Sequence, residues 1–391
     1  MAVDLNYWTI AGLIVGLLVL LPTIMGFFSS NKFNVSGKTV LLTGASEGMG
    51  KSVAIQLSQK GANIIIITRL PITTTQADNK RVQASAANPS TQRFQYISAD
   101  VSEPDGAARV IAEAIAWNNG ESPDIVWCIA GAAYPGLFID TPVSIMRHQM
   151  DVNFWSCADM AHAVLGDWLT PSALQQGKER HLVFTSSVVA FYSLAGYTPY
   201  APAKAAIKSL SDTLAQEVLL YGDNVKIHTV FPGTILSNGY ATENQTKPDV
   251  THILEAADPQ QTPEAVAARS IAGLEKGQYL VTVNWLGSLM RACAWGCSTR
   301  NNWLFDTLEI WLASIVALFV GMDMDGKVVS YRKKHGHPST YYKKFMSQGD
   351  IAKSSNTKSQ ICFFGFPESI GFLLIIIGFQ IMDGITYIAS M

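Results

Sequence analysis

Charged residues are scarce in this chain of 391 residues. Aspartate, glutamate, lysine and arginine make up only 15% of it, and the formal net charge is −2. Such a near-neutral balance offers no electrostatic footprint for a nucleic acid, so we expect no nucleic-acid partner. Hydrophobic residues make up 48% of the chain, a high fraction for a soluble protein, which suggests that some segments associate with a membrane.

Cysteine is also rare. The five cysteines stand at positions 128, 157, 293, 297 and 362, an odd number with scattered spacing. This pattern argues against a disulfide framework, and no group of cysteines and histidines has the spacing of a zinc site. We therefore expect reduced thiols, a domain that faces the cytosol, and no metal.

Charge is absent altogether from residues 5–31, a run long enough to span roughly 30 Å of hydrocarbon as a helix. Asp4 precedes the run and no basic start is present, which favours a retained anchor over a cleaved signal peptide. Lys32 and Lys38 follow it, so the positive-inside rule places the next domain in the cytosol. We expect an N-terminal transmembrane helix within residues 1–30.

Charge and periodicity change again after about residue 280, and the remainder, 281–391, is predicted to be a membrane-associated region. Asp306 and Glu309 interrupt its first apolar segment, 303–321, which we expect to lie in the membrane interface rather than to cross. The stretch 332–360 is strongly basic and should stay in the cytosol. For residues 369–391 the sequence leaves spanning and surface binding open.

Between these regions, residues 31–280 have the pattern of a parallel α/β sheet. The stretch KTVLLTGASEGMGKSVAIQLSQKGANIIIITR begins with an apolar run, passes through a glycine turn and a helical period, and ends in a β-branched run. Further apolar runs, FQYISADV, DIVWCIAGAA, HLVFTSSVV and VKIHTVFPG, alternate with helix-like segments. This alternation predicts a Rossmann-type, doubly wound sheet that is covered on both faces.

The first turn of this sheet has the features of a dinucleotide site. Gly44, Gly48 and Gly50 let the backbone approach a pyrophosphate at a helix N-terminus. NAD-selective folds place an acid at the end of the second strand, but this strand ends in Arg69. A guanidinium can bind a 2′-phosphate, so we expect NADPH. Asp100, at the end of the next strand, is a candidate for the adenine amino group.

The stretch GYTPYAPAKAAIKSL contains the candidate for chemistry. Tyr200 and Lys204 are four residues apart and share a helix face, whereas Tyr197 has Ala201 at the matching place. Thr198 is expected to be the helix N-cap. A cation held beside a tyrosine favours the phenolate and is expected to lower the pKa of the hydroxyl, which would make Tyr200 a better proton donor at neutral pH.

TGASEGMG, Ser187, Tyr200-Ala-Pro-Ala-Lys204 and FPG at 231–233 resemble, in order and spacing, the short-chain dehydrogenase/reductase family over roughly residues 36–280. The resemblance implies a seven-stranded sheet and assigns Tyr200 as the acid. It assigns Lys204 to the nicotinamide ribose, Ser187 to the carbonyl oxygen and Asn153 to a water relay. The cofactor residues expected on this basis are Gly44, Ser46, Glu47, Gly48, Gly50, Arg69, Asp100, Val101, Tyr200, Lys204 and Thr234.

One motif departs from the family pattern. The turn after the fourth strand usually reads Asn-x-Ala-Gly, but here it is Cys128-Ile129-Ala130-Gly131. That asparagine stabilises the structure near the cofactor, so its replacement puts the rigidity of this turn in doubt.

The loop after FPG contains the unusual run ENQTKP, and AGAAYPGLFID stands at 130–140. With both apolar ends, these segments are similar to family members of the endoplasmic reticulum membrane that reduce the ketone of a long-chain sphingoid base. A membrane lipid environment and a homo-oligomer are both compatible with this resemblance, and Glu243 is a candidate for the substrate amine. A hydroxysteroid dehydrogenase, an acyl-dihydroxyacetone-phosphate reductase, for which the loop offers only Lys247, and a non-catalytic NADPH-binding scaffold remain as alternatives.

Overall fold

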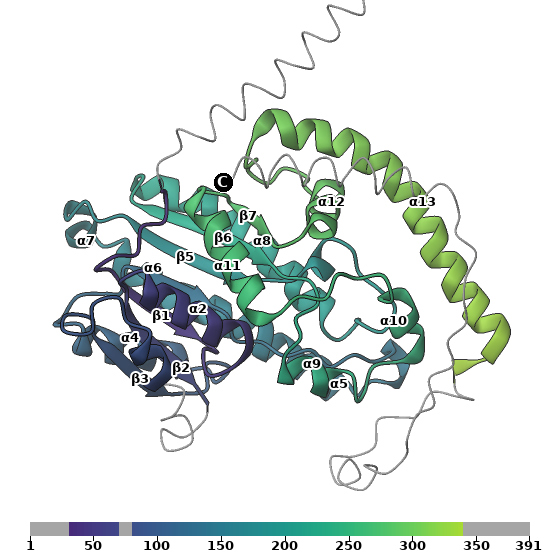
Figure 1. Cartoon of the computed structure of the whole chain (residues 1–391), viewed down its shortest axis with the longest axis horizontal. Coiled ribbons are helices and arrows are strands. Elements are labelled where there is room, and N and C mark those ends of the chain that lie inside the picture. The colour runs from purple at the N-terminus through teal and green to yellow at the C-terminus, as the bar shows by residue number, and fades with distance from the viewer. Residues whose placement is uncertain (1–30, 70–79, 339–391) are drawn as a thin grey trace, which may run out of the picture. The chain divides into compact units, whose positions relative to one another are not determined.

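Seven parallel strands form the centre of the computed structural model, which describes residues 31–69 and 80–338 (Figure 1). Their order in the sheet is β3-β2-β1-β4-β5-β6-β7, so the predicted doubly wound parallel sheet is confirmed. The predicted N-terminal helix lies outside the described residues. The strands are β1 (Thr39–Thr43), β2 (Asn63–Thr68), β3 (Phe94–Ser98), β4 (Ile125–Cys128), β5 (Arg180–Thr185), β6 (Val225–Phe231) and β7 (Leu280–Thr282).

Helices cover both faces of the sheet because successive strand residues point to opposite sides. Leu41 and Ile65 pack with α4, α6 and α8, whereas Val40 and Ile64 pack with α2 and α11. Strands that are buried on both faces need continuous apolar runs, which is why β2 reads NIIIIT. The covering helices are α2 (Gly48–Gln59), α4 (Gly106–Trp117), α6 (Ser156–Trp168), α8 (Ala201–Glu217) and α11 (Pro263–Glu275).

The strand order reverses between β1 and β4, because the chain returns from β3 at one edge to pair β4 with β1. In sheets of this kind, ligands bind in the crevice at the carboxyl ends of the strands beside such a reversal. Shorter helices border that end of the sheet. They are α5 (Val143–Met150), α9 (Asn238–Glu243) and α10 (Asp249–Leu254), whereas α7 (Pro171–Gln175) precedes the start of β5 at the opposite end of the sheet.

Helix α8 begins later than the sequence predicts. Tyr200, not Thr198, occupies its N-cap position, and Pro202 stands in its first turn. The N–H groups of both Tyr200 and Ala201 bond to the carbonyl of Tyr197, at 3.0 and 2.8 Å. This turn ends where the helix begins, so the Thr198 prediction was wrong, while Tyr200 is placed at the very start of α8.

The sheet continues past residue 280, where the sequence suggested a domain boundary. Leu280 pairs with Thr229 of β6, and the strand β7 runs to Thr282. Helix α12 (Trp285–Cys293) packs against β7, and α13 (Trp303–His335) packs against α12 as one continuous helix of 33 residues. All described residues from Phe33 onward belong to one compact unit.

Candidate active site

A pocket of about 510 Å³ opens at the carboxyl ends of the strands. Three of the four expected catalytic residues line it, and Asn153 does not. All of the expected cofactor residues line it as well: Gly44, Ser46, Glu47, Gly48, Gly50, Arg69, Asp100, Val101, Tyr200, Lys204 and Thr234. The structure therefore brings together segments that are spread over 190 residues of the chain.

Two glycines, one in the turn after β1 and one in the first turn of α2, stand where a side chain has no room. Gly44 has φ +66°, and a Cβ there would lie 2.7 Å from the Cα of Ala130. A Cβ on Gly50 would lie 2.3 Å from the carbonyl oxygen of Gly44. The side chain of Glu47, at the N-cap, makes no capping hydrogen bond to the first turn of α2. A bare backbone and a helix N-terminus fit the pyrophosphate of a dinucleotide.

Arg69 stands at the end of β2 and borders the same pocket. Its Nη1 lies 3.8 Å from Oδ2 of Asp100, and both side chains are substantially exposed. Asp100 is held by Ser102, whose N–H and hydroxyl donate to Oδ1 at 2.9 and 2.6 Å. No carboxylate follows Thr68 on this strand. The edge thus offers a guanidinium where NAD-selective folds offer an acid.

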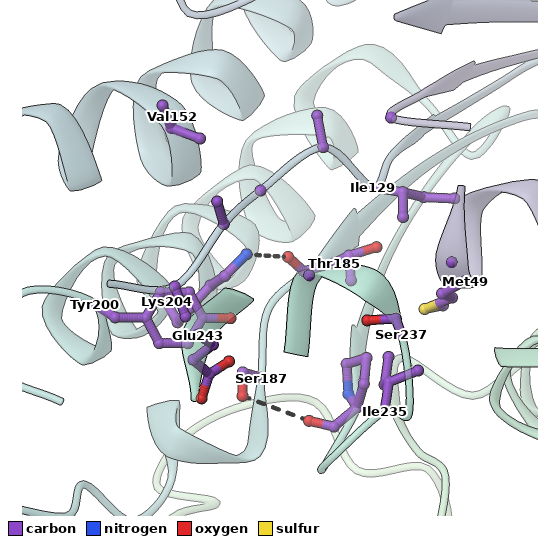
Figure 2. Close-up of a pocket in the computed structure, with 18 of the residues that line it drawn as sticks. Met49, Ile129, Val152, Thr185, Ser187, Tyr200, Lys204, Ile235, Ser237 and Glu243 are labelled. Carbon is purple, nitrogen blue, oxygen red and sulfur yellow. Dashed lines mark hydrogen bonds between the residues drawn. The ribbon is translucent and has the colours of Figure 1, made fainter. Parts of the chain in front are cut away.

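Figure 2 shows Tyr200, Ser187 and Lys204 facing one part of the pocket. Ser187 follows β5, and its hydroxyl donates to the carbonyl of Pro232 at 3.4 Å. Lys204 is almost completely buried in the first turns of α8. Its Nζ donates to the carbonyl of Thr185 at 3.0 Å and lies 5.5 Å from the centre of the Tyr200 ring. The spacing of four residues does place the cation beside the tyrosine.

The pKa values of this pair differ from the sequence-based expectation. Burial, and next the charge of Glu243, raise the pKa of Tyr200, while the Ser187 hydroxyl lowers it in part. Burial lowers the pKa of Lys204 to about 8. The pKa of Tyr200 is therefore raised rather than lowered as expected, because desolvation and a nearby carboxylate both disfavour the phenolate.

Asn153 lies beside the pocket and is hydrogen-bonded to the backbone. It lies in the π-helical turn η2 (Asp151–Trp155) and is completely buried. Its Nδ2 donates to the carbonyls of Ala132 and Gln149 at 2.9 and 3.0 Å, and its Oδ1 accepts from the Ala132 N–H at 3.2 Å. The side chain holds the loop that borders the pocket, which makes Asn153 a positioning residue in this structure.

The turn that lacks the usual asparagine is held by another residue. The Thr43 hydroxyl accepts hydrogen bonds from the N–H groups of Ile129 and Ala130, at 3.0 and 3.1 Å. Next to them, a Cβ on Gly131 would lie 2.7 Å from Oδ1 of Asn153. Two polar side chains from β1 and η2 thus fix the 129–132 segment, so its rigidity does not depend on residue 128.

Sequence reasoning missed a polar network beside Tyr200. The Tyr197 hydroxyl lies 2.5 Å from Oε1 of Glu243 and 2.6 Å from Oε1 of Glu255, so the two carboxyl groups share its single proton. The Lys247 ammonium lies 2.8 Å from the first carboxylate and 2.7 Å from the second, and its side chain is completely buried. These partners stand up to 58 residues apart, so only the spacing of Glu243 and Lys247 could have indicated part of the network.

Comparison with known sequences identifies relatives of this chain. The family model for the short chain dehydrogenase matches residues 38–248. A 3-ketodihydrosphingosine reductase of Neurospora crassa is 54% identical over 325 residues, which cover 82% of this chain and 90% of that protein. A 3-ketodihydrosphingosine reductase of Aspergillus fumigatus is 46% identical over 332 residues, 81% of this chain and 90% of that protein.

Solved structures with the same fold are more distant in sequence. A short-chain dehydrogenase from Sphingobium yanoikuyae in complex with NADPH aligns with a TM-score of 0.52 at 21% identity, covering 63% of this chain and 87% of that one. A short-chain dehydrogenase/reductase from Burkholderia phymatum in complex with NAD aligns with a TM-score of 0.54 at 18% identity, covering 64% and 90%. They share the fold, and between them their cofactors include both dinucleotides.

Proposed function

The chain belongs to the short-chain dehydrogenase family, and we propose that within it the chain reduces 3-ketodihydrosphingosine to dihydrosphingosine with NADPH, a step of sphingolipid biosynthesis. The observation that carries this proposal is the convergence of Ser187, Tyr200 and Lys204 on one pocket with the glycine turn. Relatives that share most of the chain are reductases of this ketone, which supplies the substrate class.

The roles of the residues follow from their chemistry. The dinucleotide, when bound along the glycine turn, supplies the hydride that reduces the carbonyl carbon. Ser187 holds the carbonyl oxygen by a hydrogen bond, and Tyr200 provides the proton that this oxygen acquires. Lys204 would hold the nicotinamide ribose. Its ammonium favours the phenolate that forms when Tyr200 gives up its proton. Asn153 keeps the loop at 131–133 in place beside them.

The choice of NADPH over NADH rests on Arg69. The end of β2 lies where the adenosine ribose is bound in this type of fold, and a carboxylate there would repel a 2′-phosphate. Arg69 instead offers a cation that can bind that phosphate in a bidentate manner, and Asp100 lies beside it for the adenine amino group.

A phosphate-bearing substrate fits the pocket less well. The single basic residue that the substrate loop could offer, Lys247, is completely buried between Glu243 and Glu255. The two carboxylates and Asp258 line the pocket. Their charge would repel an acyl-dihydroxyacetone phosphate, whereas it would attract the protonated amine of a sphingoid base. This observation disfavours the phosphate alternative.

We also propose that the chain acts at the cytosolic face of the endoplasmic reticulum membrane, because the long alkyl chain of its substrate partitions into the bilayer. Helix α13 is long and apolar enough to cross a bilayer. Its inward side includes the buried Ala313 and Val316, and near its start it is held by ion pairs: Arg291 of α12 lies 3.2 Å from Glu309 and 3.8 Å from Asp306. Its large exposed hydrophobic side chains are Trp303, Leu308, Trp311, Leu312, Ile315, Leu318, Phe319, Met322 and Val329.

A surface helix of a soluble protein normally turns its large apolar side chains toward the core, but α13 leaves these exposed. An outward apolar stripe with tryptophans at one end and Arg332, Lys333 and Lys334 at the other suits a helix that lies in the headgroup region. Near its end, Tyr331 packs in one cluster with Leu194, which also lines the pocket. We therefore propose that α13 lies in the interface close to the substrate entrance.

NADPH oxidation in detergent tests the activity. Purified full-length protein should oxidise NADPH with 3-ketodihydrosphingosine and do so far more slowly with a steroid ketone or acyl-dihydroxyacetone phosphate. A preference for either of the last two would replace the proposal with that alternative, and NADPH binding without turnover of any ketone would indicate the scaffold. For orientation, a glycosylation reporter inserted near residue 350 should remain unmodified in microsomes; its modification would contradict the cytosolic placement.

A further inference from the structure

Glu243 brings a carboxylate to the reacting end of the pocket. It is the last residue of α9, and in Figure 2 its side chain faces the same part of the pocket as Tyr200 and Ser187. One of its oxygens, Oε1, accepts from Tyr197 at 2.5 Å and lies 2.8 Å from Nζ of Lys247. Among the described residues, none donates a hydrogen bond to the other oxygen, Oε2. That oxygen is available to a ligand.

The neighbourhood of Glu243 carries an excess of negative charge. Two carboxyl groups, those of Glu243 and Glu255, pair with one ammonium, that of Lys247, so acidic groups outnumber basic ones in this network. Asp258 lines the same pocket, and burial, with the charge of Glu255, raises its pKa to about 6. Partly buried negative charge attracts a cation because little water is present to screen it.

We propose that the free oxygen of Glu243 binds the ammonium group of an α-amino ketone, and that Tyr197 and Lys247 hold the carboxylate in position for it. This inference rests on the proposed function, because 3-ketodihydrosphingosine carries its amine on the carbon next to the ketone. When Ser187 and Tyr200 hold the carbonyl oxygen, the adjacent amine must fall within reach of groups at their side. Glu243 is such a group.

Binding of the ammonium also acts on the proton donor. Glu243 is one of the groups that raise the pKa of Tyr200 in the structure, after burial itself. A bound ammonium neutralises that charge and so lowers the cost of forming the phenolate. Tyr200 then becomes a better acid only when the amine is in place. Recognition of the amine therefore affects turnover as well as binding.

The test compares two substrates that differ only in the amine. For the wild-type protein, we expect kcat/KM to be about tenfold to a hundredfold higher with 3-ketodihydrosphingosine than with 1-hydroxyoctadecan-3-one, the difference that one charge-assisted hydrogen bond supports. Glu243→Gln keeps the size of the side chain and an acceptor for Tyr197, but removes the charge. It should bring the ratio of the two kcat/KM values close to one, mainly by lowering the value for the amino ketone.

Two further variants separate recognition from general damage. Glu255→Gln should keep most of the discrimination, because both of its oxygens are already used by Tyr197 and Lys247. Glu113→Gln, at an exposed ion pair on α4, should match the wild type. Loss of activity toward both substrates in equal proportion in Glu243→Gln, with NADPH binding retained, would overturn the inference, since it would indicate a structural role only.

The wild-type comparison decides even if Glu243→Gln fails to fold, as judged by NADPH binding. Equal kcat/KM values for the two ketones would overturn the inference while leaving the proposed function intact. A wild-type protein that reduces neither ketone would instead contradict the proposed function. A third outcome is a large ratio of kcat/KM values in the wild type that is lost in Glu255→Gln but kept in Glu243→Gln. It would assign recognition of the amine to Glu255 and refute the role given to Glu243.

Discussion

Tyr197 and Glu243, 46 residues apart in the chain, are joined by a hydrogen bond of 2.5 Å. The bond links the turn that precedes α8 to the end of α9, so the segment carrying Tyr200 and the segment that borders the substrate site are held together. The sequence contains two tyrosines in this turn and predicts chemistry for one of them. In the structure the other tyrosine, Tyr197, connects these two segments.

Tyr200→Phe should abolish most of the catalysis without weakening cofactor binding. The substitution removes the proton donor and leaves the glycine turn and Arg69 untouched. We expect turnover to fall by roughly a hundredfold or more, as for the loss of a general acid, at unchanged NADPH affinity measured by fluorescence titration. Turnover close to that of the wild type would show that Tyr200 is not the acid.

Tyr197→Phe should have a visible effect, although the sequence alone predicts almost none. The change removes the hydroxyl that Glu243 and Glu255 share in a largely buried setting and leaves them Lys247. Hydrogen bonds to charged groups contribute about 1.5–3 kcal/mol, so both thermal stability and substrate affinity should decrease. KM for the ketone should rise more than kcat falls. A variant with wild-type melting temperature and KM would contradict this.

Arg69→Asp should move the preference from NADPH toward NADH. A carboxylate at the end of β2 repels the 2′-phosphate and can bind the ribose hydroxyl that NADH presents there. The measured quantity is the ratio of kcat/KM for the two cofactors, with Arg109→Asp, an exposed arginine on α4, as the control. If the ratio is the same in both variants and the wild type, Arg69 plays no part in cofactor selection.

Aspartate substitutions at Trp311 and Phe319 should weaken membrane binding through α13. Both side chains are more than two-thirds exposed on the outer face of the helix, where no described residue covers them. We expect less full-length protein to float with liposomes containing anionic lipid, while the rate in detergent stays near that of the wild type. Leu220→Asp, at an exposed leucine of η4 (Val218–Tyr221), is the matched control. Equal flotation of the double variant and this control would refute a role for the stripe.

Stability should decrease in mild acid because of a buried histidine pair. Nδ1 of His181 lies 3.1 Å from Nε2 of His228, and burial lowers their pKa values to about 2 and about 4. Both values lie below the ordinary pKa of about 6.5, so the neutral forms stabilise the fold fully above that pH. As the pH falls toward 4, these two histidines bind protons in the unfolded chain but remain neutral in the folded chain. The free energy of unfolding therefore decreases.

The measurement for the histidine pair is the melting temperature between pH 7.5 and 5. It should fall in the wild type and fall less in the double variant His181→Leu/His228→Leu. His252→Leu, an exposed histidine on α10, should keep the wild-type slope. An unchanged slope in the double variant would mean that other groups cause the loss of stability in acid.

The sheet, the glycine turn and the Tyr200–Lys204 pair could be predicted from the sequence because each depends on local order. Parallel strands buried on both faces require apolar runs such as NIIIIT, and a helix places residues four apart on one face. The turn at Gly44 requires a residue that tolerates positive φ and a close backbone. These requirements act between near neighbours, so they remain visible in the linear chain.

Only the tertiary structure decided the environment of those residues. The pKa of Tyr200 depends on burial and on Glu243, the turn at Ile129 depends on Thr43, and the inward side of α13 depends on Arg291. Each of these relationships joins segments from different parts of the fold, and electrostatic and desolvation energies depend on distance in space rather than on separation in the chain. For that reason the sequence by itself determined which groups could do chemistry, and the packing of the chain around the pocket determined the charge and the partners that each group meets.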